Sequence, residues 1–171
     1  TLLQTSLMQV NVLPQVSVTP YDTVTVCRGV PVTFTANAGT GLTYQWYKYG
    51  NLMPGETNQE LTTTLAGKYK VKVTDSGTGC FKKSGKRVVV VNQPPAASIA
   101  AQGPITFCDD SSVVLLASTD PLNTIQWTKG YADIIGETSG SFVAGKTGWY
   151  RVRVIDPNGC TKYSTGVSVQ V

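Results

Sequence analysis

The strongest constraint on the fold of this chain is an internal repeat with a spacing of 81 residues. The matched residues are Cys27 and Cys108, Gln45-Trp46 and Gln126-Trp127, Gly55-Glu56-Thr57 and Gly136-Glu137-Thr138, Gly67 and Gly148, Tyr69 and Tyr150, and Asp75 and Asp156. One residue then drops out, so that Cys80 is matched by Cys160 at a spacing of 80. Self-similarity at a fixed period indicates two copies of one folding unit.

The repeat also predicts the domain boundaries. It assigns one unit to residues 13–92 and the other to residues 93–171. Val10 and Asn11 align with the end of the first unit, so we expect residues 1–12 to form the last strand of a preceding copy. The chain would then be a segment of a longer series of repeats. The junction contains Pro94-Pro95, and prolines favour a short, stiff connection.

The cysteines recur in register and predict one disulfide for each unit. A unit of about 80 residues buries a thin core and commonly needs a covalent cross-link. Each repeat holds one cysteine near its start and one near its end, so we predict the bonds Cys27–Cys80 and Cys108–Cys160. Closing a loop of that length stabilises a fold by about 4 kcal/mol. Disulfides indicate an oxidising compartment, here the outside of a cell.

Composition argues against several classes of function. The chain has no histidine, which removes the commonest general base and the commonest metal ligand, and it has no C-x-x-C pair. We therefore predict no catalytic residues, no cofactor, no metal site and no enzymatic activity. A net charge of +4 is too weakly basic for a typical nucleic-acid-binding domain. The longest apolar run, near residues 113–117, is too short for insertion into a membrane.

Apolar and polar residues alternate with the period of half-buried strands. Lysines alternate with Tyr69, Val71 and Val73, and arginines alternate with valines at 151–154. Turn-forming residues separate such segments, and no helical periodicity of useful length occurs. About seven short strands for each unit of about 80 residues predict an all-β fold of two antiparallel β-sandwiches.

Two recurring motifs resemble the immunoglobulin-like (Ig-like) sandwich. They are a tryptophan on the third strand, Trp46 or Trp127, and a Gly-x-Tyr motif that opens a late strand. In that fold the tyrosine forms a corner with nearby backbone and the tryptophan lies in the core. The cysteines depart from the antibody pattern, because Val71 and Val152 hold the place of its second cysteine.

The full pattern is similar to that of a bacterial family. It runs Cys, Tyr/Ile-x-Trp, Gly-x-Tyr-x-Val-x-Val-x-Asp, Gly-Cys and a valine-rich last strand. It resembles the tandem Ig-like modules of large cell-surface adhesins in Bacteroidota, including gliding-motility adhesins and proteins exported by the type IX secretion system. The resemblance implies a secreted segment of a stiff stalk for cell adhesion. Its partners would be neighbouring repeats of the same chain, and surface glycans or other cell-surface proteins.

Two alternatives to the stalk remain open. One is a glycan- or protein-binding Ig-like module, for which Tyr47 and Tyr49 are the candidate contacts, because they are expected to face outward beside Lys48. The other is an accessory domain of a secreted polysaccharide hydrolase. The resemblance also implies a possible O-glycan on Thr23, because Asp22-Thr23-Val24 fits the Asp-Ser/Thr-apolar acceptor pattern of that family. We expect Glu56 and Glu137, which recur within Gly-Glu-Thr, to have a turn role.

Overall fold

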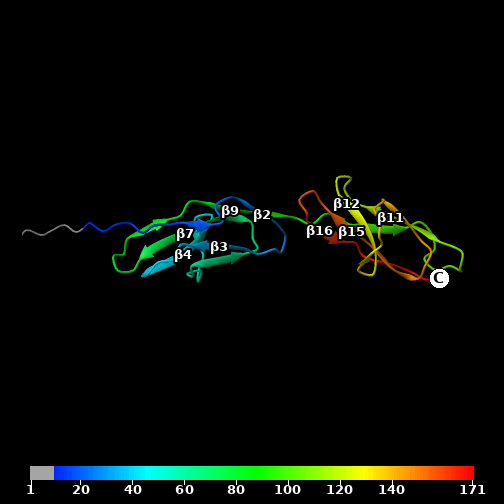
Figure 1. The fold of residues 1–171 in the computed structure, drawn as a ribbon, viewed down its shortest axis with the longest axis horizontal. Helices are drawn as coiled ribbons and strands as arrows, with labels where there is room; N and C mark the ends of the chain where they lie inside the picture. Colours follow the sequence, from blue (N-terminus) through cyan, green and yellow to red (C-terminus); the bar gives the residue numbers. More distant parts are fainter. Residues whose placement is uncertain (1–9) are drawn as a thin grey trace, which may run out of the picture. The chain divides into compact units, whose positions relative to one another are not determined.

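A computed structural model describes residues 10–171, and these residues form only strands and connecting segments (Figure 1). The chain divides into two compact units between Val91 and Asn92, which we call module 1 and module 2. Each is an antiparallel β-sandwich, as predicted from the repeat. No helix among the described residues is long and apolar enough to cross a membrane.

The strand predicted over residues 1–12 lies largely outside the described residues. The part that is described, Val10 to Val12, belongs to no strand. The side chains of Val10 and Val12 are 82% and 84% exposed. Pairing of this segment with a neighbouring module therefore stays a prediction.

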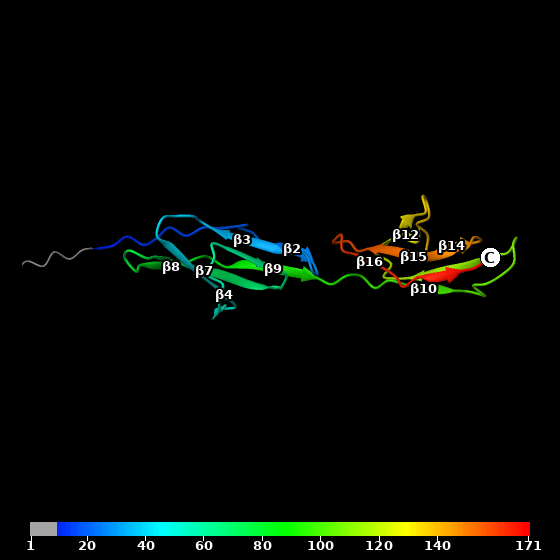
Figure 2. The same cartoon turned by 90° about the horizontal axis from the view of Figure 1, so that it is seen from below.

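Module 1 consists of two sheets, and in Figure 2 β3 lies in one layer whereas β4 and β7 lie in the other. The smaller sheet has the order β1 (Val18–Thr19), β3 (Val32–Ala36), β6 (Glu60–Thr63). The larger has the order β2 (Val24–Cys27), β9 (Arg87–Asn92), β7 (Gly67–Asp75), β4 (Leu42–Lys48), β5 (Asn51–Leu52), and β8 (Phe81–Lys83) also pairs with β7.

Module 2 repeats this arrangement. Its smaller sheet has the order β10 (Ser98–Ala101), β11 (Val113–Ser118), β14 (Ser141–Ala144). Its larger sheet has the order β13 (Ala132–Asp133), β12 (Thr124–Lys129), β15 (Gly148–Ile155), β16 (Thr161–Tyr163), and β17 (Val167–Val169) also pairs with β15. The central strand pairs, β4 with β7 and β12 with β15, match in register at the repeat spacing.

The cores form from the alternation seen in the sequence. On β7, Tyr69, Val71 and Val73 are fully buried, whereas the intervening lysines point to the other face. Trp46 and Trp127 are also fully buried, so the prediction of core tryptophans is confirmed. Alternate burial of apolar side chains against a second sheet is what stabilises such a sandwich.

The recurring Gln-Trp dipeptide is explained by a hydrogen-bond frame. The side-chain amide of Gln45 donates to the carbonyl oxygen of Met53 at 2.8 Å and to that of Trp46 at 3.1 Å. Gln126 makes the same bonds to the carbonyl oxygens of Ile134, at 2.8 Å, and of Trp127, at 3.0 Å. The tryptophan that follows each glutamine also donates its ring N–H to a loop carbonyl. These bonds satisfy buried polar groups that would otherwise destabilise the fold.

The predicted tyrosine corner is present in both modules. The hydroxyl of Tyr69 donates to the carbonyl oxygen of Leu65, and that of Tyr150 to the carbonyl oxygen of Lys146, each at 2.8 Å. The glycine two residues before each tyrosine lies against a lysine side chain of the neighbouring strand, where a Cβ would be crowded. The Gly-x-Tyr motif is therefore a packing motif.

The predicted disulfides Cys27–Cys80 and Cys108–Cys160 are not found. Cys80 and Cys108 are free thiols, whereas Cys27 and Cys160 are disulfide-bonded. The reason lies in the strand directions. Cys160 lies beside the end of β15, where the backbone N–H of Asp156 donates to its carbonyl oxygen at 3.0 Å. Cys108 follows Phe107, which bonds to Gln170 beside the beginning of β15.

Candidate functional site

The two tyrosines predicted as ligand contacts lie near each other but in different environments. Tyr47 is half-buried on β4, opposite Lys70 of β7, and the Nζ atom of Lys83 lies 4.6 Å from the centroid of its ring. Tyr49 follows β4 in a turn with a φ of 51° and is 61% exposed. Of the two, Tyr49 is the side chain that a ligand can reach over a wide area.

Tyr49 borders an open depression of about 430 Å³ in module 1, lined also by Gly50, Lys68, Lys70 and Lys86. The lysines come from β7 and from the residue before β9, so the larger sheet positions them. Further lysines continue the row across the sheet, because Lys72 of β7 pairs with Lys83 of β8. We call this surface the lysine face; its residues are Tyr49, Lys68, Lys70, Lys72, Lys83 and Lys86.

The lysine face carries uncompensated positive charge. None of its lysines forms an ion pair with an acidic side chain anywhere in residues 10–171. Lys72 and Lys83 instead lie over aromatic rings, at 4.2 Å from the centroid of Phe81 and 4.6 Å from that of Tyr47. A surface with charge of one sign attracts ligands of the opposite sign. The chemistry of this face therefore suits an anionic ligand.

The equivalent face of module 2 has a different chemistry. Trp149, Arg151 and Tyr163 replace Lys68, Lys70 and Lys83. The guanidinium carbon of Arg151 lies 4.7 Å from the ring centroid of Tyr131, 4.8 Å from that of Trp149 and 4.9 Å from that of Tyr163. We call these four residues the aromatic–arginine cluster. Sequence reasoning missed it, because its members come from a turn and two strands.

The arginines of module 2 on this face are bonded within the module, although Nη1 of Arg151 and Nε of Arg153 are buried without a hydrogen-bond partner. The Nε atom of Arg151 donates to the carbonyl oxygen of Ser164 at 3.2 Å, and its guanidinium is covered by aromatic rings. Arg153 forms an ion pair with Asp133 at 2.7 Å. The face is therefore a packed surface layer, in contrast to the open lysine face of module 1.

Four further acidic residues, Asp120, Asp156, Glu56 and Glu137, lie in or beside turns. A second depression of about 420 Å³ includes Asp120 and Asp156, but the carboxylate of each accepts hydrogen bonds from backbone N–H groups of its own turn. Glu56 and Glu137 follow glycines with positive φ, at 81° and 85°, in turns. No group of three acidic or cysteine residues that could hold a metal ion occurs within residues 10–171.

Thr23, the residue predicted to carry an O-glycan, is exposed just before β2 begins at Val24. A sugar on its hydroxyl would meet solvent. Its glycosylation stays a prediction.

No family model matches the sequence, and no curated protein matches it. Solved structures to which the chain is similar include the fibronectin(III)-like modules of Clostridium thermocellum CbhA, at 11% identity and a TM-score of 0.43, covering 91% of this chain and 94% of that chain. The titin I-band fragment I67-I69 matches at 14% identity and a TM-score of 0.43, covering 86% of this chain and 62% of that one. Domains 3-5 of the Drosophila OTK extracellular region match at 19% identity and a TM-score of 0.46, covering 92% and 62%. The chain thus spans less than two thirds of the titin and OTK fragments.

Proposed function

We propose that this chain is a non-enzymatic structural segment of a bacterial cell-surface adhesin, two Ig-like modules of a stalk that holds a distal binding region away from the cell. The observation that carries the proposal is what the two modules have in common. They share the Gln-Trp hydrogen bonds and the tyrosine corner, whereas the exposed faces of their larger sheets differ. The two modules thus share the residues that hold the sandwich together but no exposed site. Repeats of this kind are typical of modules whose role is to extend a chain.

The location of the protein on the source cells tests the proposal. Antibodies against residues 10–171 should label intact, non-permeabilised source cells, and brief protease treatment of those cells should remove the signal. An intracellular protein treated in the same way is the control for cell integrity. Labelling that requires permeabilised cells would contradict a surface stalk.

The lysine face favours a second function, binding of an anionic glycan or an acidic protein surface. Its lysines lack acidic partners within the described chain, and Tyr49 beside them offers an exposed aromatic ring for stacking on a sugar. Binding through exposed charges is screened by salt. Retention on a dextran sulfate column, compared with neutral dextran, therefore tests this function over a range of salt concentrations.

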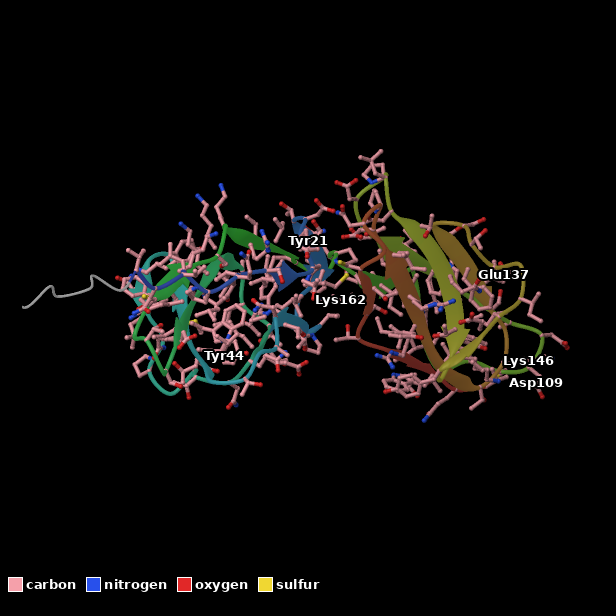
Figure 3. The ribbon with its side chains drawn as sticks, turned by 60° about the vertical axis from the view of Figure 1, so that its left-hand side comes forward. Tyr21, Tyr44, Asp109, Glu137, Lys146 and Lys162 are labelled. Atoms are coloured by element: carbon pink, nitrogen blue, oxygen red, sulfur yellow. The ribbon has the colours of Figure 1, made fainter. Side chains whose placement is uncertain are left out.

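A matched pair of variants separates this site from general basic charge. The double variant Lys68→Gln/Lys70→Gln removes two charges from the lysine face, and we expect a roughly three- to tenfold loss of affinity for dextran sulfate. Lys146→Gln/Lys162→Gln removes two exposed charges from module 2, where Figure 3 labels both residues. Equal losses in the two variants would show that only net charge matters and would contradict a site on module 1.

A further inference from the structure

Part of the lysine face forms a row along β7. Lys68, Lys70 and Lys72 alternate with the buried residues of this strand, so the three side chains leave the sheet on the face away from the core. Alternate residues of a strand lie about 7 Å apart, so the three residues, which we call the lysine row, extend over roughly 13 Å. The positive charges of this surface are therefore spaced along a line.

An exposed aromatic side chain lies at each end of the lysine row. At one end, the backbone N–H of Tyr49 donates to the carbonyl oxygen of Lys68 at 2.8 Å. At the other end, Phe81 of β8 pairs with Thr74, and the Nζ atom of Lys72 lies 4.2 Å from the centroid of its ring. Each of the two aromatic residues is at least half exposed. Their rings can therefore stack on the faces of sugar rings.

A fourth lysine brings charge to the middle of the row. Lys83 is the cross-strand partner of Lys72 on β8, and β8 and β4 pair with the same part of β7, one on each side. The Nζ atom of Lys83 nevertheless lies 4.6 Å from the ring centroid of Tyr47, which belongs to β4 and is the partner of Lys70. The side chain of Lys83 therefore crosses the row, and positive charge gathers along β7.

Lysines recognise the charge and spacing of anionic groups more than their shape. The ammonium group of a lysine is a compact point charge, whereas the guanidinium of an arginine holds a carboxylate or phosphate through two parallel hydrogen bonds. The lysine row contains no arginine. We therefore expect it to select a ligand by the number of anionic groups that one chain can present along β7.

Module 2 has no such row. The equivalent residues of β15 are Trp149, Arg151 and Arg153. Arg151 lies against three aromatic rings, and Arg153 forms an ion pair with Asp133. The row is therefore a property of module 1 and not of the fold.

We propose that the lysine row binds a linear acidic polysaccharide, which lies extended along β7 with its anionic groups against successive lysines and its sugar rings against Tyr49 and Phe81. This inference rests on the second proposed function and adds to it the form of the ligand. A polymer with an anionic group on successive sugars contacts several lysines at once. Each contact after the first forms within the complex, which raises the affinity without any new kind of interaction.

A length series of one ligand tests this inference. Galacturonic acid, its trimer and its hexamer are titrated at low salt into the full chain, isotope-labelled for NMR. We expect the hexamer to bind roughly 10- to 100-fold more tightly than the monosaccharide, since each further exposed ion pair contributes a factor of about two to five. Its amide shifts should extend from Lys68 to Lys72. A gain of sixfold or less, which six independent sugars would give, would overturn the inference.

Two neighbouring lysines provide a matched pair of variants. Lys83→Gln removes a charge from the middle of the row. Lys82→Gln removes one from the adjacent residue, which is also exposed but pairs with the buried Val73 and therefore points to the other face of the sheet. We expect Lys83→Gln to lower the affinity for the hexamer about two- to fivefold and Lys82→Gln to leave it unchanged. Equal losses in the two variants would contradict binding along the row.

A peptide polyanion separates the sugar from the charge. Poly-glutamate carries a carboxylate on every residue but no sugar ring. Tyr49→Asn removes the aromatic ring, and asparagine tolerates the positive φ of 51° at this position. We expect it to weaken binding of the hexamer about two- to tenfold and to leave binding of poly-glutamate unchanged. An equal effect on both ligands, or no effect on either, would indicate an acidic protein as the partner and overturn the choice of a polysaccharide.

The same chain distinguishes failure of this inference from failure of the function on which it rests. Binding of dextran sulfate without the expected gain along the galacturonate series would overturn the extended ligand and leave anion binding by the lysine face standing. No binding of dextran sulfate or of any galacturonate oligomer at low salt would contradict both.

Discussion

Phe34 of β3 and Leu61 of β6 are cross-strand partners in the core of module 1, and the equivalent pair in module 2 has the two side chains exchanged, as Leu115 and Phe142. In both modules the phenylalanine contacts the core tryptophan and the corner tyrosine. The ring centroid of Phe34 lies 6.3 Å from that of Trp46, and that of Phe142 lies 5.5 Å from that of Trp127. The two cores therefore hold the same pair of side chains, but the phenylalanine lies on β3 in module 1 and on β14, the equivalent of β6, in module 2.

This exchange predicts strong coupling between the two positions. Phe34→Leu alone should lower the free energy of unfolding by roughly 1–2 kcal/mol through a cavity, and Leu61→Phe alone by roughly 1–3 kcal/mol through overpacking. The double variant recreates the order found in module 2 and should cost less than about 1.5 kcal/mol. Denaturant unfolding of all four proteins measures the coupling. Additive effects would contradict the interpretation that the modules are alternative packings of one core.

We predict that the ring of Trp149 in the aromatic–arginine cluster can hold its position only if residue 166 is glycine. A Cβ at position 166 would overlap the Nε1 atom of the indole, which lies along this backbone. Gly166→Ala should therefore displace the ring from Arg151 and lower the stability of module 2 by roughly 1–3 kcal/mol. Thermal unfolding and tryptophan fluorescence report the two effects.

Gly140→Ala is the matched control for that substitution. A Cβ there meets no atom within 4 Å, and the residue does not have a positive φ. Its stability should be unchanged or higher by up to about 1 kcal/mol, because alanine restricts the unfolded chain. The same loss of stability in both variants would show that Trp149 is not the cause.

The tyrosine corner of module 2 should make stability depend on alkaline pH. Burial raises the pKa of Tyr150 above its ordinary value of 10.0. The unfolded chain therefore loses this proton first, so stability present below pH 10 falls as the pH rises toward the raised pKa. Tyr150→Phe should remove this alkaline loss and lower stability at neutral pH by roughly 1 kcal/mol, because its hydroxyl no longer bonds to Lys146.

Unfolding of the two proteins by denaturant between pH 8 and pH 11 provides the measurement. Tyr131→Phe is the control, since the side chain of Tyr131 is 71% exposed. It should follow the parent protein at every pH. A Tyr150→Phe protein with an unchanged alkaline loss would contradict the assignment to this hydroxyl.

The elements of the fold were predictable because they depend on local pattern. Alternation around Tyr69 identifies a half-buried strand, and the register of the repeat identifies Trp46 and Trp127 as equivalent core residues. The glutamine that precedes each tryptophan gives no such signal, because its bonds reach loop carbonyls whose positions depend on the whole hairpin. The exchange of phenylalanine and leucine between the two modules could not be predicted either, because it becomes visible only when the pairing of β3 with β6 is known.

The cysteine pairing was predicted wrongly for a related reason. The repeat shows that Cys27 corresponds to Cys108, and Cys80 to Cys160, but it does not show at which end of a sandwich each lies. That depends on the direction of β7 and β15, which separate the members of each predicted pair. The aromatic–arginine cluster was also missed, because Tyr131 and Tyr163 reach Arg151 only through the turn after β12 and the pairing of β16 with β15.

Single-molecule extension tests most directly whether the chain consists of two separately folded modules of a stalk. The chain is stretched between its two ends in the presence of a reducing agent. We expect two unfolding events, each of which releases about 260–290 Å of contour length, because each module has about 80 residues at about 3.3–3.6 Å for each residue. A single unfolding event for both modules, or extension without any force peak, would contradict this account.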